Sequence, residues 1–158
     1  MKKLAPLLLV SLLAVGQPVY AQSQTKQVSS QPSIPSPEYL SVLVQSTIQY
    51  LDQANQADDY SLLLRLSSRQ MQSSTSPASL SASFQPFRQA RVDLAPSVIY
   101  GIRWNAAPTI NNGILSLNGN ITSQPSEVNF DFRYVQDNGK WRLLGLSVGL
   151  VPGRTASN

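Results

Sequence analysis

Apolar positions in the first half of the chain recur every three or four residues, which is the spacing of a helix that buries one face. The clearest run predicts a helix over residues 37–54, with Ser36 as its N-cap and Pro37 at its first position. A shorter helix is expected over residues 58–68, followed by a loop at 70–75. A third helix is expected to begin at Ser76-Pro77 and to kink or break near Gln85, because Pro86 lacks a backbone donor.

After Asp93 the apolar positions alternate, and four strands are expected over residues 97–105, 113–122, 126–136 and 140–150. Turn-forming residues separate them. A three-residue loop, Asp137-Asn138-Gly139, predicts a hairpin in which Gln136 pairs with Lys140 and Phe132 with Leu144. We therefore expect an α+β domain in which three N-terminal helices pack on a curved four-stranded antiparallel sheet.

The segments outside this domain have their own patterns. Lys2 and Lys3, an apolar run over residues 4–15 and a small residue at Ala21 predict a signal peptide over residues 1–21. Residues 22–37 are rich in Ser, Gln and Pro and predict a flexible linker, and residues 153–158 a frayed tail. We expect one domain over residues 38–152, in a secreted or periplasmic protein with no membrane anchor after cleavage.

Composition narrows the chemistry. The chain has no Cys and no His, which excludes disulfides, thiolate and imidazole metal ligands, and Cys or His catalysis. Its formal net charge falls from +4 to +2 when Lys2 and Lys3 leave with the signal peptide. A net charge of +2 without a Lys/Arg cluster does not predict a surface that binds nucleic acid. No Gly-rich phosphate loop or acidic calcium loop is present, so we expect no metal and no cofactor.

The end of the chain resembles a known superfamily. The residues concerned are the alternating aromatic strand Val128–Tyr134, the turn Asp137–Gly139 and the Lys-Trp-Arg-Leu sequence at Lys140–Leu143. These resemble the cystatin-like, nuclear-transport-factor-like (SnoaL-like) superfamily, and residues 87–96 resemble small secreted bacterial members of unassigned function. The resemblance implies a cone-shaped pocket between sheet and helices, which some relatives use for catalysis and others for binding or dimerisation.

Carboxylates suited to catalysis are few. Asp93 precedes the first expected strand and is most simply a turn residue, and Asp131 is in mid-strand but is expected on the outer face. The other acids are expected in turns, at a strand edge, or at helix ends and on polar helix faces. The sequence therefore favours a protein without a catalytic carboxylate, and we assign no catalytic residue.

Other side chains could line or border the expected pocket. Arg142 is expected on the core side near the hairpin, where it would either bind an anion or cover the margin of the core with its stem. The remaining members of this set are tyrosines that could present hydroxyls and Asp93. The pocket or rim set is Tyr50, Tyr100, Tyr134, Arg142 and Asp93.

An apolar patch is expected on the sheet face opposite the helices. Trp141 forms it with Val135 and Leu143, and Trp104 either joins it or closes the pocket. Such a patch is typical of an interface, and a homodimer through the outer sheet face is the partner it would fit. The alternative is that the linker or a loop covers it.

These patterns favour an exported, non-enzymatic ligand-binding or protein-interaction module. One alternative is a pocket enzyme, of the isomerase or dehydratase kind, acting on a small hydrophobic molecule. A second alternative is an accessory subunit of an envelope complex. Asp93 or Asp131 lining a buried cavity beside a tyrosine would favour the enzyme.

Overall fold

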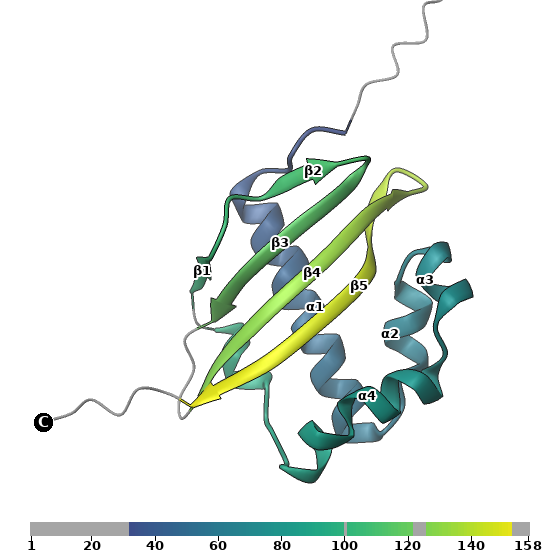
Figure 1. The fold of residues 1–158 in the computed structure, drawn as a ribbon, viewed down its shortest axis with the longest axis vertical. Coiled ribbons are helices and arrows are strands. Elements are labelled where there is room, and N and C mark those ends of the chain that lie inside the picture. The colour runs from purple at the N-terminus through teal and green to yellow at the C-terminus, as the bar shows by residue number, and fades with distance from the viewer. Residues whose placement is uncertain (1–31, 100, 122–125, 153–158) are drawn as a thin grey trace, which may run out of the picture. The chain divides into compact units, whose positions relative to one another are not determined.

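A computed structural model describes residues 32–99, 101–121 and 126–152. The described chain is α+β (Figure 1), as predicted, but with four α-helices and five strands where three and four were expected. The predicted signal peptide, most of the linker, the C-terminal tail and Tyr100 lie outside the described residues. The elements are α1 (Pro37–Ala57), α2 (Ser61–Leu66), α3 (Arg69–Ser74), α4 (Pro77–Gln89), the 3-10 helix η1 (Ala95–Val98), β1 (Ile102–Trp104), β2 (Thr109–Asn111), β3 (Ile114–Ile121), β4 (Ser126–Asp137) and β5 (Lys140–Pro152).

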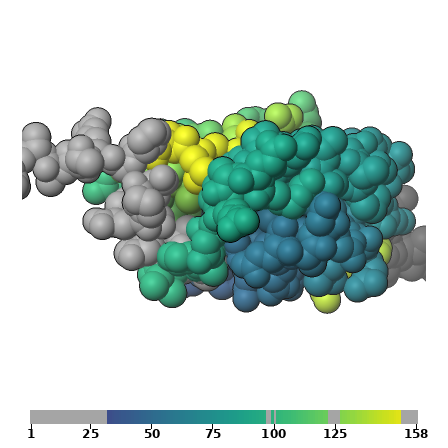
Figure 2. Space-filling view, turned by 90° about the horizontal axis from the view of Figure 1, so that it is seen from below, coloured from purple at the N-terminus to yellow at the C-terminus, as the bar shows by residue number. Residues whose placement is uncertain are grey.

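Local caps fix the starts of the two longer helices. Ser36 Oγ accepts a hydrogen bond from the backbone N–H of Tyr39 at 3.3 Å, and Ser76 does the same for Ser79 at 3.1 Å. Both caps are followed by proline, as the sequence predicts. Helix α1 continues three residues beyond its expected end and stops at Asp58, whose φ is 49°. Helix α4 lies against α1, as the view from below shows (Figure 2).

Three helical predictions need correction. Residues 58–68 form a helix only from Ser61 to Leu66, and most of the loop expected at residues 70–75 belongs to α3. Helix α3 exists because Ser68 caps it and Met71 is buried in the core. Of the kink or break expected near Gln85, the break does not occur, because helix α4 runs from Pro77 to Gln89 with Pro86 inside it. The bond that Pro86 cannot donate would end on exposed Ala82, where solvent can replace it.

The strands form one antiparallel sheet in the order β1-β3-β4-β5, and β2 also pairs with β3. The first expected strand, residues 97–105, is wrong over most of its length. Residues 95–98 form η1, with Pro96 in its first turn, and the strand is confined to Ile102–Trp104. Strand β2 lies within the segment expected as a turn, at residues 106–112.

The β4–β5 register also differs from the expected one. Asp137 pairs with Lys140 across a two-residue turn, in which Asn138 and Gly139 have φ of 52° and 72°. Two successive positive φ values are typical of a type I′ turn, which suits the twist of a hairpin. A bulge then leaves Leu144 as an extra residue, so that Phe132 lies opposite Leu146 rather than Leu144.

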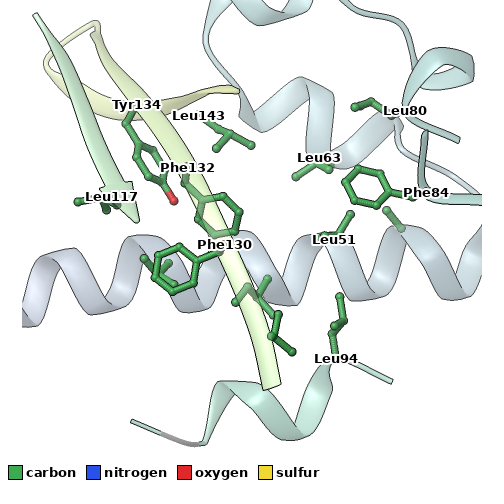
Figure 3. Packing of buried hydrophobic residues seen from close by; sticks show 14 of the residues in the cluster. Leu51, Leu63, Leu80, Phe84, Leu94, Leu117, Phe130, Phe132, Tyr134 and Leu143 are labelled. Carbon is green, nitrogen blue, oxygen red and sulfur yellow. The ribbon is translucent and has the colours of Figure 1, made fainter. Parts of the chain in front are cut away.

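The core lies between the sheet and α1 and is filled by side chains (Figure 3). One face of α1 meets the aromatic row of β4, in which successive rings contact one another at 5.1–6.4 Å between centroids. The buried apolar residues are Leu40, Val44, Ile48, Leu51, Ala54, Tyr60, Leu63, Met71, Leu80, Phe84, Leu94, Leu115, Leu117, Ile121, Val128, Phe130, Phe132, Tyr134 and Leu143. The space in which the resemblance implies a pocket is therefore occupied by this core.

Candidate functional site

A cavity of about 310 Å³ lies where the C-terminal ends of α1 and α4 meet. Its floor and walls come from three segments: the end of α1, the last turn of α4 and the loop that leaves α4 toward η1, the region seen in Figure 2. A volume near 300 Å³ is at the lower end of the range for small-molecule sites. The lining residues are Asn55, Gln56, Phe87, Arg88, Arg91, Val92 and Asp93.

The C-terminal cap of α4 builds one wall. The N–H of Val92 donates to the carbonyl of Phe87 and the N–H of Arg91 to that of Arg88, each at 3.0 Å. Arg91 has a left-handed φ of 50°. This pattern is the Schellman motif, in which the residues on either side of the cap also make an apolar contact. Here those residues are Phe87 and Val92, both half-buried against the core, and they supply the apolar part of the cavity.

Asp52 fastens the loop after α4 to helix α1. Its side chain is only 4% exposed, and Oδ1 accepts a hydrogen bond from the N–H of Leu94 at 2.9 Å. Oδ2 accepts a second from Gln56 Nε2 at 2.7 Å. Burial raises the pKa of Asp52, against the lowering effect of the Leu94 bond, and the charge of nearby Asp93 raises it further. Both carboxylate oxygens are thus engaged in holding the wall.

Arg88 is locked by several partners. Its Nε forms an ion pair with Asp58 Oδ1 at 3.1 Å, and its side chain is 18% exposed. Nη1 donates to the hydroxyl of Tyr60 at 2.8 Å and to the carbonyl of Ser81 at 2.9 Å, and Nη2 donates to Ser81 Oγ at 2.9 Å. The guanidinium therefore has a fixed orientation, and its charge is largely balanced by Asp58.

This network determines how Asn55 is oriented. The Tyr60 hydroxyl accepts from Arg88, so its single proton is donated to Asn55 Oδ1. Burial raises the pKa of Tyr60, with Arg88 opposing the rise, so the hydroxyl stays protonated. Asn55 is 6% exposed, and its Nδ2 has no hydrogen-bond partner in the described part of the chain. A buried donor left in this state costs about 1–3 kcal/mol unless a ligand or solvent satisfies it.

The predicted pocket residues are dispersed. Tyr134 is buried in the core, where its hydroxyl contacts Thr47 Oγ1 at 2.8 Å and donates to the carbonyl of Leu43 at 3.1 Å; Figure 3 shows it pointing toward α1. Tyr50 packs at the edge of the core, and Tyr100 is outside the described residues. Among the described members of the set, only Asp93 lines the cavity. It is exposed, and its Oδ1 accepts from the N–H of Ala95 at 2.9 Å, as a turn residue does.

Arg142 is not on the core side. It lies opposite Val135 in the observed register, one residue away from the predicted pairing with Tyr134, and therefore on the outer side of the sheet. Its Nη1 donates to the carbonyl of Leu66 at the end of α2, at 3.1 Å. The two-residue turn accounts for this correction, because shifting the register by one residue moves each side chain to the other face.

The same shift removes the predicted outer-face patch. Leu143 is 6% exposed and belongs to the core, and Trp141, two residues before it on the same face, packs against the core as well. Val135 stays on the outer side, so these three residues form no common surface. Trp104 packs edge-on against Phe130, with ring centroids 6.0 Å apart. The homodimer through the outer sheet face therefore stays a prediction, and this patch no longer supports it.

Two further hollows are less suited to a ligand. One, of about 360 Å³, lies over Asp131 and Arg133 on the outer sheet face, and Asp131 is exposed there as predicted, accepting from Asn118 Nδ2 at 3.3 Å. The other, of about 280 Å³, contains Asp137, whose carboxylate is occupied by Arg69 through an ion pair at 2.9 Å and the backbone N–H of Arg69 at 2.9 Å. Neither combines a buried unpaired donor with apolar walls.

The sequence contained part of the signal for the cavity. Arg88 interrupts the apolar stripe of α4, which marks an arginine turned toward the protein. Asn55 and Arg91 were missed, because an Asn near a helix end and an Arg after one are ordinary surface residues until the fold brings them together. Asp52 is one of the acids expected at helix ends or on polar helix faces. The structure instead buries it beneath the loop that follows α4, a contact that the sequence pattern does not show.

In the described residues no three acidic side chains gather as a metal site would require, and none of the helices there is long and apolar enough to cross a membrane. Comparison with known proteins found no family model, no curated protein and no solved structure that matches the chain.

Proposed function

We propose that this protein is an exported, non-enzymatic binding module that takes a small ligand in the cavity between α1 and α4. The observation that carries the proposal is Asn55 Nδ2: a donor on a side chain that is 94% buried, without a partner among the described residues, at the wall of a cavity. A ligand carbonyl or carboxylate oxygen would satisfy it, and Phe87 and Val92 would cover an apolar part of the same molecule.

Binding is favoured over catalysis by the state of the ionisable groups. A general base needs a free carboxylate or amine that faces the reacting atom. Asp52 uses both of its oxygens on the wall, and Arg88 and Tyr60 are engaged in one network. Asp93 is exposed and accepts the backbone N–H of Ala95, as a turn residue does. The site is thus equipped to hold a molecule.

The finer fold assignment and the location belong to the same proposal. A cystatin-like domain is supported by the long helix α1 packed across an antiparallel sheet and by the aromatic alternation of β4. The filled interior means that the binding site would lie at the end of α1 rather than inside the cone. Export is supported by the tripartite pattern of residues 1–21.

The test is a thermal-shift screen of small carbonyl and carboxylate compounds, followed by affinity measurement for every compound that raises Tm. Asn55→Asp keeps the oxygen that Tyr60 contacts and replaces the free donor by an acceptor. We expect this variant to bind hits at least tenfold more weakly, while Asn129→Asp on the outer sheet face binds as the unaltered protein does. An empty screen, or equal binding by Asn55→Asp, would overturn the proposal.

A further inference from the structure

The rim of the cavity carries one available positive and one available negative charge. Arg88 already shares its guanidinium with Asp58, Tyr60 and Ser81, so the available cation is that of Arg91, whose side chain is exposed and has no polar partner among the described residues. Asp93 engages one oxygen with the Ala95 N–H and leaves the other without a described partner. The described structure contains no ion pair between Arg91 and Asp93.

The backbone of Arg91 strengthens the case that its side chain serves a ligand. It occupies the left-handed position of the Schellman cap, with φ of 50°, where glycine or asparagine is usual. An arginine there stores strain that a glycine would release. Strained non-glycine residues gather at functional sites, and here the strained residue borders the cavity that contains the unpaired Asn55 donor.

We infer that the ligand is a small zwitterion of the α-amino-acid type with an apolar side group, an inference that rests on the proposed binding function. The ligand carboxylate binds Arg91 and Asn55 Nδ2, its ammonium group binds the free oxygen of Asp93, and its apolar group lies on Phe87 and Val92. The two rim charges cancel, so a dipolar molecule complements them better than a plain anion or cation does. The cavity volume, about 310 Å³, fits a ligand of this size.

Four probes with a similar branched apolar group separate the contributions of the carboxylate and the ammonium group to binding. L-Leucine carries both charges, 4-methylpentanoate only the carboxylate, 3-methylbutylamine only the ammonium group, and 4-methylpentanamide neither. Isothermal titration should show leucine binding at least tenfold more tightly than the carboxylate-only and ammonium-only probes. Arg91→Gln should reduce the advantage of leucine over the amine, because Asn55 Nδ2 alone is left to bind the carboxylate, and Arg91→Lys should restore part of it. Asp93→Asn should abolish the advantage of leucine over the carboxylate.

Arg91→Gly provides a readout that a purely structural role would not give. Releasing the left-handed strain should raise Tm, while loss of the guanidinium should weaken leucine binding at least tenfold. The inference is overturned if 4-methylpentanamide binds as tightly as leucine, if Arg91→Gly binds leucine normally, or if none of the four probes binds. The wider screen with Asn55→Asp tests the proposed function separately. A neutral ligand whose binding depends on Asn55 would support the binding function and contradict only the zwitterion.

Discussion

Asp52 offers the sharpest test of how the cavity wall is held, because two substitutions separate its hydrogen bonds from its charge. Asp52→Asn keeps an oxygen that can accept from the Leu94 N–H, whereas Asp52→Ala removes the acceptor. Gln56, the second partner, is exposed and can turn its amide to suit an asparagine.

The magnitude follows from what each variant removes. Taking away the acceptor of a buried N–H costs about 1–3 kcal/mol, so Asp52→Ala should lower the free energy of unfolding by about 2 kcal/mol. The raised pKa of Asp52 means that the folded protein prefers the neutral carboxyl, since burial outweighs the hydrogen bonds. A neutral isostere should then be at least as stable as aspartate at pH 7.

The pH dependence has a defined sign. In the unfolded chain Asp52 ionises near pH 3.9, and in the folded protein it ionises at a higher pH. Between these values the folded state binds more protons, so stability falls as pH rises from about 4 through the folded pKa, and the loss is complete above it. Asp52→Asn has no such group, so its stability relative to the unaltered protein should increase over this window.

Urea unfolding at pH 3.5 to 8 measures all three proteins. The reasoning is refuted if Asp52→Asn is as unstable as Asp52→Ala at pH 7, or if the difference between Asp52→Asn and the unaltered protein does not change with pH. Because Asp52 holds the loop with Arg91 and Asp93, Asp52→Ala should also weaken ligand binding, and Asp52→Asn should not.

Three further predictions concern the fold. A Cβ at Gly119 would overlap the carbonyl of Arg103 and lie 2.8 Å from the Phe130 ring, so Gly119→Ala should lower the free energy of unfolding in urea by about 2 kcal/mol. Gly149 has open space around it, so Gly149→Ala should change that free energy by no more than about 0.5 kcal/mol. Equal effects of the two substitutions would contradict the packing. Tyr134→Phe should cost about 1 kcal/mol in urea unfolding. Because burial raises the pKa of Tyr134, this tyrosine should not ionise before the protein unfolds, so a spectrophotometric titration should count as many ionising tyrosines in the variant as in the unaltered protein. The stability of the unaltered protein should fall as pH rises above about 10. The backbone N–H of Arg69 holds the pKa of Asp137 below its usual value, so Asp137→Asn should lower Tm at pH 7. The difference in Tm between the variant and the unaltered protein should vanish as pH falls below about 4 through the folded pKa. A difference in Tm that is the same at every pH would contradict this prediction.

Where local chemistry decides a structure, the sequence was a good guide. Ser36-Pro37 and Ser76-Pro77 mark helix starts because a hydroxyl cap and a proline act on their own neighbours. Helix α3 was expected as loop because the local Ser68 cap is only part of what stabilises it. The carboxylate of Asp137, distant in the sequence, also accepts from the N–H of Arg69 at the start of this helix.

The hairpin shows how a small local error spreads. The sequence predicts a three-residue loop at Asp137–Gly139, whereas the structure has a two-residue turn. This difference of one residue exchanges the sheet faces on which Trp141 and Arg142 lie. The bulge at Leu144 was not readable from the alternation. It lies where the Ser68 N–H donates to the carbonyl of Leu143 at 2.8 Å, a contact between segments far apart in the sequence.

The candidate site was the least predictable part, because its residues have ordinary local explanations. Asn55 lies on α1 and Arg91 follows α4, and only the packing of these helices gives them a common cavity. The resemblance directed attention to the inside of the cone, where the structure has a filled core.

The central claim is that the Asn55 amide is a ligand donor, and the side-chain ¹⁵N–¹H signals of Asn55 test it most directly. Titrating ¹⁵N-labelled protein with L-leucine, and with any hit of the wider screen, should shift the two Asn55 Nδ2 proton signals saturably and leave those of Asn129 in place. Ligands that bind without moving the Asn55 signals would contradict the account, and so would a full screen that yields no ligand.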